Sequence, residues 1–77
     1  MRLATAELRP GQWVNLVDFG QTELSYRHRL LALGLTLGAC VRVVRRAPLG
    51  CPLQLEVRGA ALIVREHELA NVIWESC

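Results

Sequence analysis

The sequence predicts a mainly β fold, a small β-barrel with one α-helix inserted after its first strand. Three observations predict it: apolar and polar residues alternate in several short segments, one segment has helical spacing, and glycine or proline separates the segments. A chain of 77 residues sets one domain, residues 1–77, as the expected organisation. Because several strands in so short a chain would leave two edges open to aggregation, closure into a barrel is expected.

The first half of the chain gives one strand and the helix. The segment WVNLVDFG, residues 13–20, alternates as a strand and ends at a glycine. Residues 21–33 change to helical spacing, with leucines that widen into one apolar face. Thr22 is the expected N-cap and Gly34 the expected C-terminal cap. We therefore expect a short amphipathic helix that buries most of its leucines.

The second half returns to strand patterns. Further strands are predicted at residues 36–46, 53–57, 61–65 and 71–74. Two prolines and a glycine in APLGCP, residues 47–52, make a stiff loop between the first two of these strands. Residues 66–70 are long enough for a single helical turn near the C-terminus. The barrel therefore carries one full helix and one short helical turn.

Composition and charge exclude several classes of function. The net charge of +2 is too small to imply nucleic-acid binding by itself. No apolar run approaches the roughly 18–20 residues that cross a bilayer, and the N-terminus lacks a signal-peptide core, so we expect a cytoplasmic protein without membrane insertion. The phosphate-binding pattern G-x-x-x-x-G-K-[ST] is missing, and Ser25 and His28 lack a third catalytic group. An enzyme is not expected.

The three cysteines are predicted to be free thiols. Their number is odd, and none are spaced as C-x-x-C, which disfavours a disulfide framework and a structural zinc site. Cys40 alternates with Val41 and is expected to be buried as a small apolar residue, whereas Cys51 and Cys77 are expected to be accessible.

Motifs along nearly the whole chain resemble the ferrous-iron transport protein A (FeoA) family. The residues that carry the resemblance are LRPG at 8–11, RLLALGL at 29–35, TLG at 36–38, APLGCP at 47–52, and the turn and strand at 58–65. Family members often have proline where Thr36 or Leu37 stands, and an apolar or aromatic residue where this chain has Ala60 and Ala61. Neither departure threatens the fold.

The resemblance implies both a fold and a function. The family is a set of small cytoplasmic SH3-like barrels that assist ferrous iron uptake. The implied partner is FeoB, a membrane transporter with a GTP-hydrolysing domain, whose activity or assembly the protein would modulate. A related barrel forms the C-terminus of metal-dependent repressors. We therefore keep two alternatives, a nucleic-acid-binding small barrel and a metal-responsive regulatory domain, and a homodimer also stays open.

Two segments are candidates for the partner-binding surface. One is the loop formed by Pro48, Leu49, Gly50 and Cys51, where a leucine between prolines lowers the ordering cost of binding. The other is the helix end, where there are more leucines than one face can bury, so that Leu33 and Leu37 are left for an interaction patch. The competing interpretations are a stiff hairpin connection and an all-core set of leucines.

A third candidate is a metal site at Glu66, His67 and Glu68. A carboxylate and an imidazole can hold a divalent metal such as Fe²⁺, or Zn²⁺ in a crystal, when water or a second copy supplies further ligands. A lone histidine is more often a surface residue, and this neighbourhood shows too few ligands for an intramolecular site.

The arginines are the last candidate group. Five of them are predicted to share one outer face: Arg42, Arg45, Arg46, Arg58 and Arg65. Such a face would contact an acidic partner or lipid head groups, with nucleic acid as the next alternative, or would simply be a solvated rim paired with Glu56 and Glu66. Aromatic residues make up only 5% of the chain, which weakens the nucleic-acid alternative because bases stack on aromatic side chains.

Overall fold

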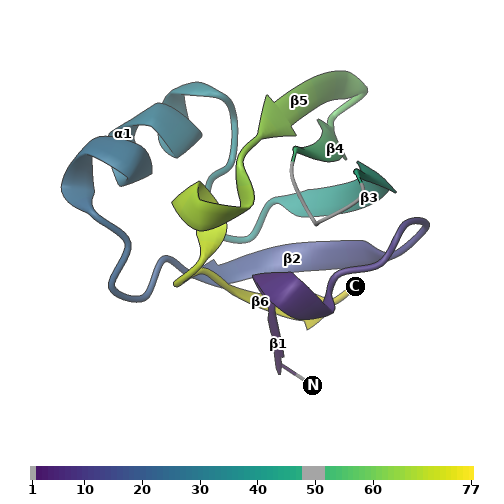
Figure 1. The fold of residues 1–77 in the computed structure, drawn as a ribbon, viewed down its shortest axis with the longest axis horizontal. Helices are drawn as coiled ribbons and strands as arrows, with labels where there is room; N and C mark the ends of the chain where they lie inside the picture. Colours follow the sequence, from purple (N-terminus) through teal and green to yellow (C-terminus); the bar gives the residue numbers. More distant parts are fainter. Residues whose placement is uncertain (1, 48–51) are drawn as a thin grey trace.

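The computed structural model describes residues 2–47 and 52–77, which form one curved sheet with a helix at its side (Figure 1). The strands are β1 (Arg2–Ala4), β2 (Trp13–Asp18), β3 (Cys40–Arg46), β4 (Leu53–Val57), β5 (Ala60–Val64) and β6 (Ile73–Ser76). The helices are α1 (Leu24–Ala32) and the short 3-10 helices η1 (Thr5–Glu7) and η3 (Glu66–Leu69). The predicted order of strands, helix and helical turn is confirmed. Neither β1 nor η1 was predicted.

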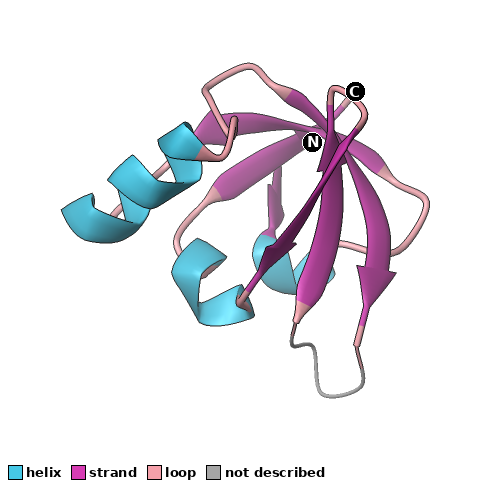
Figure 2. Cartoon of the chain, turned by 90° about the horizontal axis from the view of Figure 1, so that it is seen from above, coloured by secondary structure: helices cyan, strands magenta, loops and turns pink. Residues whose placement is uncertain are grey.

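All strands pair antiparallel, in the order β1-β6-β2-β3-β4-β5. Figure 2 shows that the strands fan out to form a strongly curved sheet, as in an SH3-like fold. The end strands β1 and β5 do not pair with each other among the described residues, so the expected closure into a continuous barrel is wrong. A β1 of three residues is too short to complete a barrel wall, and η1 lies near η3 on this side of the sheet.

The core lies inside the curve of the sheet and follows the predicted alternation. Every second residue is buried throughout β4, in β2 up to Leu16 and in β3 up to Val43, while the residues between them face outward. Trp74 of β6 is fully buried and is the largest side chain of the core. α1, η3 and the segments that follow them contribute further buried residues to the core: Leu30, Leu35, Leu69 and Val72. The strand segments therefore owe their position to burial of one face.

A β-bulge in β3 changes the direction of Arg46. The register shifts between Val43 and Arg45, so that Arg45 lies opposite Gln54 and Arg46 lies opposite the fully buried Leu53. An extra residue in one strand reverses the alternation beyond it. The prediction that Arg46 shares the outer face with the other arginines is therefore wrong.

Helix α1 begins later than predicted and ends as predicted. Thr22 is not the N-cap: its hydroxyl donates to the Phe19 carbonyl oxygen at 2.5 Å, and the helix starts after Glu23. At the other end Gly34 adopts φ +97°, and the Leu35 N–H donates to the Leu30 carbonyl oxygen at 2.9 Å. A left-handed glycine with this bond is the expected C-terminal cap.

The burial of the helix leucines differs from the expectation. Leu30 is the one buried residue of α1, and Leu35 is buried beyond it, but Leu31, Leu33 and Leu37 are exposed. Because α1 lies beside the sheet instead of across its face, only a narrow side of the helix meets the core (Figures 1 and 2). The prediction that most of these leucines are core is therefore wrong.

Two of the cysteines also depart from the expectation. Cys40 and Cys77 form a disulfide, with Cα atoms 6.8 Å apart, instead of free thiols. Cys40 is exposed, because the first residue of β3 faces away from the core. Cys51 lies outside the described residues.

Candidate partner-binding surface

The end of α1 and the connection that follows it expose three leucines within seven residues. Leu31, Leu33 and Leu37 are 40%, 37% and 60% exposed. Large apolar side chains scattered singly over a surface are common, but a group in one short segment is typical of an interaction site. The structure thus leaves Leu33 and Leu37 accessible, as a partner-binding role requires.

This helix is held by specific contacts with other elements and not by a broad apolar face. Tyr26 meets His67 of η3 edge to face, with ring centroids 5.8 Å apart. The Arg27 guanidinium lies over the Phe19 ring, 5.5 Å from its centroid. Arg29 forms an ion pair with Glu68 of η3. Together with the buried Leu30, these contacts fix the orientation of α1 without covering its leucines.

Glu68 is the buried anchor of this attachment. Its side chain is 2% exposed and accepts hydrogen bonds from the Arg29 guanidinium and from the Arg65 N–H, the latter at 3.2 Å. Burial alone would raise the pKa of Glu68. The two hydrogen bonds and the positive charge of Arg29 outweigh burial and hold the pKa below its usual value. The carboxylate is therefore charged and paired at neutral pH.

A shallow hollow of about 330 Å³ lies between α1 and the end of the segment 47–52. It is lined by Arg29, Pro52, Ile63, Val64, Arg65 and Glu68. At the base of the segment, the Ala47 N–H donates to the Pro52 carbonyl oxygen at 3.2 Å. The candidates Pro48, Leu49, Gly50 and Cys51 lie outside the described residues, but Pro52 brings the end of their segment to the same hollow as α1.

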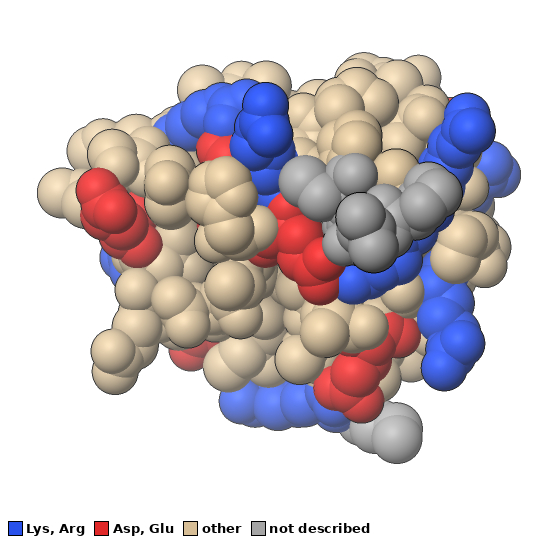
Figure 3. Space-filling model, viewed as in Figure 1, with Lys and Arg blue, Asp and Glu red and all other residues tan. Residues whose placement is uncertain are grey.

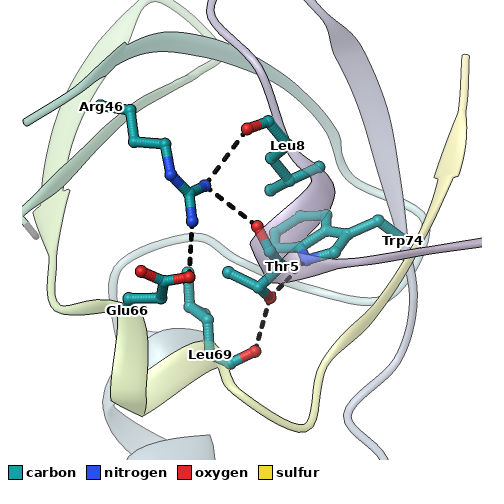
Figure 4. A network of polar contacts seen from close by, with 6 residues as sticks. All are labelled: Thr5, Leu8, Arg46, Glu66, Leu69 and Trp74. Carbon is teal, nitrogen blue, oxygen red and sulfur yellow. Dashed lines mark hydrogen bonds and ion pairs between the residues drawn. The ribbon is translucent and has the colours of Figure 1, made fainter. Parts of the chain in front are cut away.

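Arg46 joins three parts of the chain at the start of that segment (Figure 4). Its guanidinium donates to the carbonyl oxygens of Thr5 and Leu8, at 3.1 and 3.2 Å, and to Glu66 Oε1 at 2.5 Å. The ion pair with Glu66 is half-buried, so solvent screens it less than a surface pair. Arg46 thus fixes the end of β3 against η1 and η3.

Thr5 extends this network into the core (Figure 4). Its hydroxyl donates to the Leu69 carbonyl oxygen at 2.6 Å and accepts from Trp74 Nε1 at 2.9 Å. Both groups are buried, so each needs a hydrogen-bond partner. Sequence reasoning missed Thr5 and Arg46 because no spacing marks them; the adjacent arginines at the end of a strand were the only signal.

The metal candidates do not converge. Glu66 pairs with Arg46, Glu68 pairs with Arg29, and His67 packs against Tyr26. Among residues 2–47 and 52–77 there is no cluster of three His, Cys, Asp or Glu side chains that could hold a metal ion.

The arginines do not form a single basic face. Arg45, Arg58 and Arg65 are exposed, Arg42 lies opposite Glu56 in the sheet, and Arg46 is turned inward. Figure 3 shows acidic and basic side chains interspersed over one face of the molecule. This arrangement matches the solvated, partly paired rim that was the alternative interpretation.

Comparison with known proteins finds a matching family and similar solved structures. The FeoA domain model matches residues 1–76. The solution structure of the FeoA protein from Chlorobium tepidum is 31% identical, with a TM-score of 0.85; the match covers 96% of this chain and 70% of that chain. A crystal structure of an iron uptake regulatory protein (FeoA) is 26% identical, with a TM-score of 0.84, and the match covers 100% of this chain and 99% of that one.

A more distant likeness involves a domain of a larger protein. A manganese-dependent transcriptional repressor in complex with manganese is 13% identical, with a TM-score of 0.88; the match covers 99% of this chain but 37% of that one. At this identity the likeness shows the fold alone.

None of the helices described is long and apolar enough to span a bilayer. By its family match and its structural relatives, the chain belongs to the FeoA family of small accessory domains, which implies an involvement in ferrous iron transport.

Proposed function

We propose that this protein is a non-enzymatic, cytoplasmic accessory protein that binds the ferrous iron transporter FeoB and modulates or assembles it. The observation that supports the proposal best is the exposure of Leu33 and Leu37, directly after a helix that is attached to η3 by an ion pair. The proposed binding surface consists of these leucines and the loop residues Pro48, Leu49, Gly50 and Cys51.

Rigid attachment matters because binding costs less when the surface is already ordered. The contacts of Arg29 with Glu68 and of Tyr26 with His67 hold α1 before any partner arrives. The apolar side chains then supply binding energy by leaving water, at roughly 25 cal/mol per Å² of surface removed. This combination favours a protein-binding module over an enzyme.

The direct test is titration of the isotopically labelled protein with the soluble cytoplasmic domain of FeoB, with and without a GTP analogue, followed by backbone NMR shifts. We expect shifts confined to residues 31–37 and to the segment 47–52. If no shifts occur with this domain or with the intact transporter in detergent, the proposal fails.

Variants locate the surface. Leu33→Asp combined with Leu37→Asp should weaken binding by about tenfold or more, and Leu49→Asp should do the same, while each variant keeps its fold. The matched control is Leu24→Asp, since Leu24 lies at the opposite end of α1 and is as exposed as Leu37, at 60%. Loss of binding in the control, or unchanged binding in both test variants, would exclude this surface.

A further inference from the structure

The disulfide between Cys40 and Cys77 lies on the outer face of the sheet, where both residues are exposed. Cys40 begins β3 and Cys77 follows β6, so the two residues come from the strands on either side of β2. Asn15 of β2 lies opposite Cys40 on one side and opposite Glu75 on the other. The bond therefore spans β2 and links its two neighbours at one end of the sheet.

Both cysteines are accessible to small molecules. Each residue is exposed, and Cys40 also lines a hollow of about 370 Å³ together with Trp13 and Arg58. Thiol–disulfide exchange requires that a thiolate reach a sulfur atom in line with the bond, so a buried disulfide is protected and an exposed one is open to attack. The position of this pair meets the access requirement.

The sheet does not depend on this bond for its pairing. Backbone hydrogen bonds already connect β2 to β3 and β2 to β6, and the apolar core lies on the opposite face from the two sulfurs. Breaking the bond thus leaves the fold in place and releases only the end of the chain. Beyond Ser76 the chain is then held by the hydrogen bond from the Cys77 N–H to the Trp13 carbonyl oxygen, at 3.0 Å, and by the contact of Cys77 Sγ with Asn15 Oδ1, at 3.2 Å.

From these observations we infer that Cys40 and Cys77 form a reversible thiol–disulfide exchange site for low-molecular-weight disulfides such as oxidised glutathione. One cysteine thiolate attacks the small disulfide, forming a mixed disulfide and releasing one small thiol. The second cysteine thiolate then attacks the mixed disulfide, forming the bond between Cys40 and Cys77 and releasing the second small thiol. The protein loses two protons and two electrons, and the small disulfide is reduced to two thiols.

Closure should change two properties of the molecule. A cross-link between residues 37 positions apart restricts the unfolded chain, so the oxidised form should melt at a temperature at least about 8 °C higher. Closure also holds the end of β6 beside Trp13, whose side chain is 53% exposed. The fluorescence of Trp13 should therefore differ between the two forms, whereas the buried Trp74 should contribute equally to both.

The experiment uses the full chain with Cys51→Ser, which leaves one cysteine pair. The protein is equilibrated in buffers of varied ratio of reduced to oxidised glutathione, and free thiols are counted by maleimide labelling and mass spectrometry. We expect a reversible change from two free thiols to none, with the higher melting temperature in the oxidised form. A Trp13→Phe variant should lose the fluorescence change and keep the thiol titration.

Three results would overturn the inference: two free thiols at every ratio, a stable glutathione adduct without an internal bond, or a bond that excess reduced glutathione cannot open. The matched control is Cys77→Ser in the same background. It should show no rise in melting temperature at any ratio. A rise in this control would mean that the disulfide is not the cause of the stabilisation.

Discussion

In β4 every second side chain is buried, and β3 follows the same pattern up to its bulge, whereas α1 buries one of its nine residues. Both regions are rich in apolar residues. The strands place most of their apolar side chains in the core, and their outer residues include Arg42, Gln54 and Glu56. The helix buries Leu30 but exposes Leu24 and Leu31, and it is attached through an aromatic contact, a cation–π contact and an ion pair.

The difference shows that apolar content has two uses in this molecule. A helix that only had to complete the core would bury an apolar stripe and expose polar residues. In α1 the attachment to η3 is mainly polar and aromatic, which leaves the apolar side chains for another surface. The proposed partner-binding role rests on this difference between the strands and the helix, and substitutions in each region test it.

The largest effect is expected in the strands. Leu55→Ala removes a fully buried side chain in the centre of β4 and should lower the free energy of unfolding by about 2–5 kcal/mol, since it loses apolar burial and leaves a cavity. Urea denaturation followed by circular dichroism measures it. A loss below about 1 kcal/mol would contradict the view that the strands carry most of the core.

The next effect tests the polar network that joins the sheet to η1 and η3. Thr5→Val removes the hydroxyl that links Leu69 and Trp74, leaving Trp74 Nε1 buried without its partner, and should cost about 1–3 kcal/mol. Thr5→Ser keeps the hydroxyl and serves as the control. Valine keeps the γ-methyl group that serine lacks, so a loss in Thr5→Val no larger than that in Thr5→Ser would contradict the role of the hydrogen bonds.

Most of the sheet could be predicted from the sequence because alternation depends only on which face is buried. The segment LQLEV was placed at residues 53–57, and β4 has these bounds. The bulge in β3 could not be predicted, because an extra residue in a strand does not change the strand's composition. In the structure this extra residue turns Arg46 inward. β1 could not be predicted either, because it has only three residues and pairs with β6, which is distant in the sequence.

The candidate site was predictable only in part, because helix burial depends on tertiary placement. Leu33 and Leu37 were predicted to be exposed because the segment has more leucines than one helical face can bury, and the structure leaves both exposed. The contacts that orient α1 join residues far apart in the chain, such as Arg29 and Glu68, so local spacing carries no sign of them. The disulfide is similar, since Cys40 and Cys77 approach only through the pairing of their strands.

A smaller effect, with a defined pH dependence, is expected where the helix joins η3. The folded pKa of Glu68 is lowered, so its ionised form is favoured in the folded protein. This contribution to stability is fully present above the ordinary glutamate pKa of about 4.5 and is lost as the pH falls below it. Glu68→Gln should cost about 1–2 kcal/mol at pH 7 and less at pH 3.

The measurement for Glu68 is urea denaturation of both proteins at pH 7, 5, 4 and 3. The difference between wild type and Glu68→Gln should shrink through the lower part of this range. Glu66→Gln is a useful comparison, because Glu66 is more exposed and pairs with a different arginine. A difference that is constant from pH 7 to pH 3 would show that the charge of Glu68 does not support the attachment of α1.

The smallest effect is expected at the exposed leucines, and it is the strictest test of the comparison. Leu33→Ala should change the free energy of unfolding by no more than about 0.5 kcal/mol, although the same truncation at Leu55 costs several times more. The two variants remove the same atoms, so urea denaturation compares position alone. If Leu33→Ala also costs 2 kcal/mol or more, the leucine belongs to the core in solution, and the surface assigned to a partner is instead part of the fold. A negligible cost, combined with weakened binding to the transporter domain, would separate the use of this leucine from the use of those in the strands.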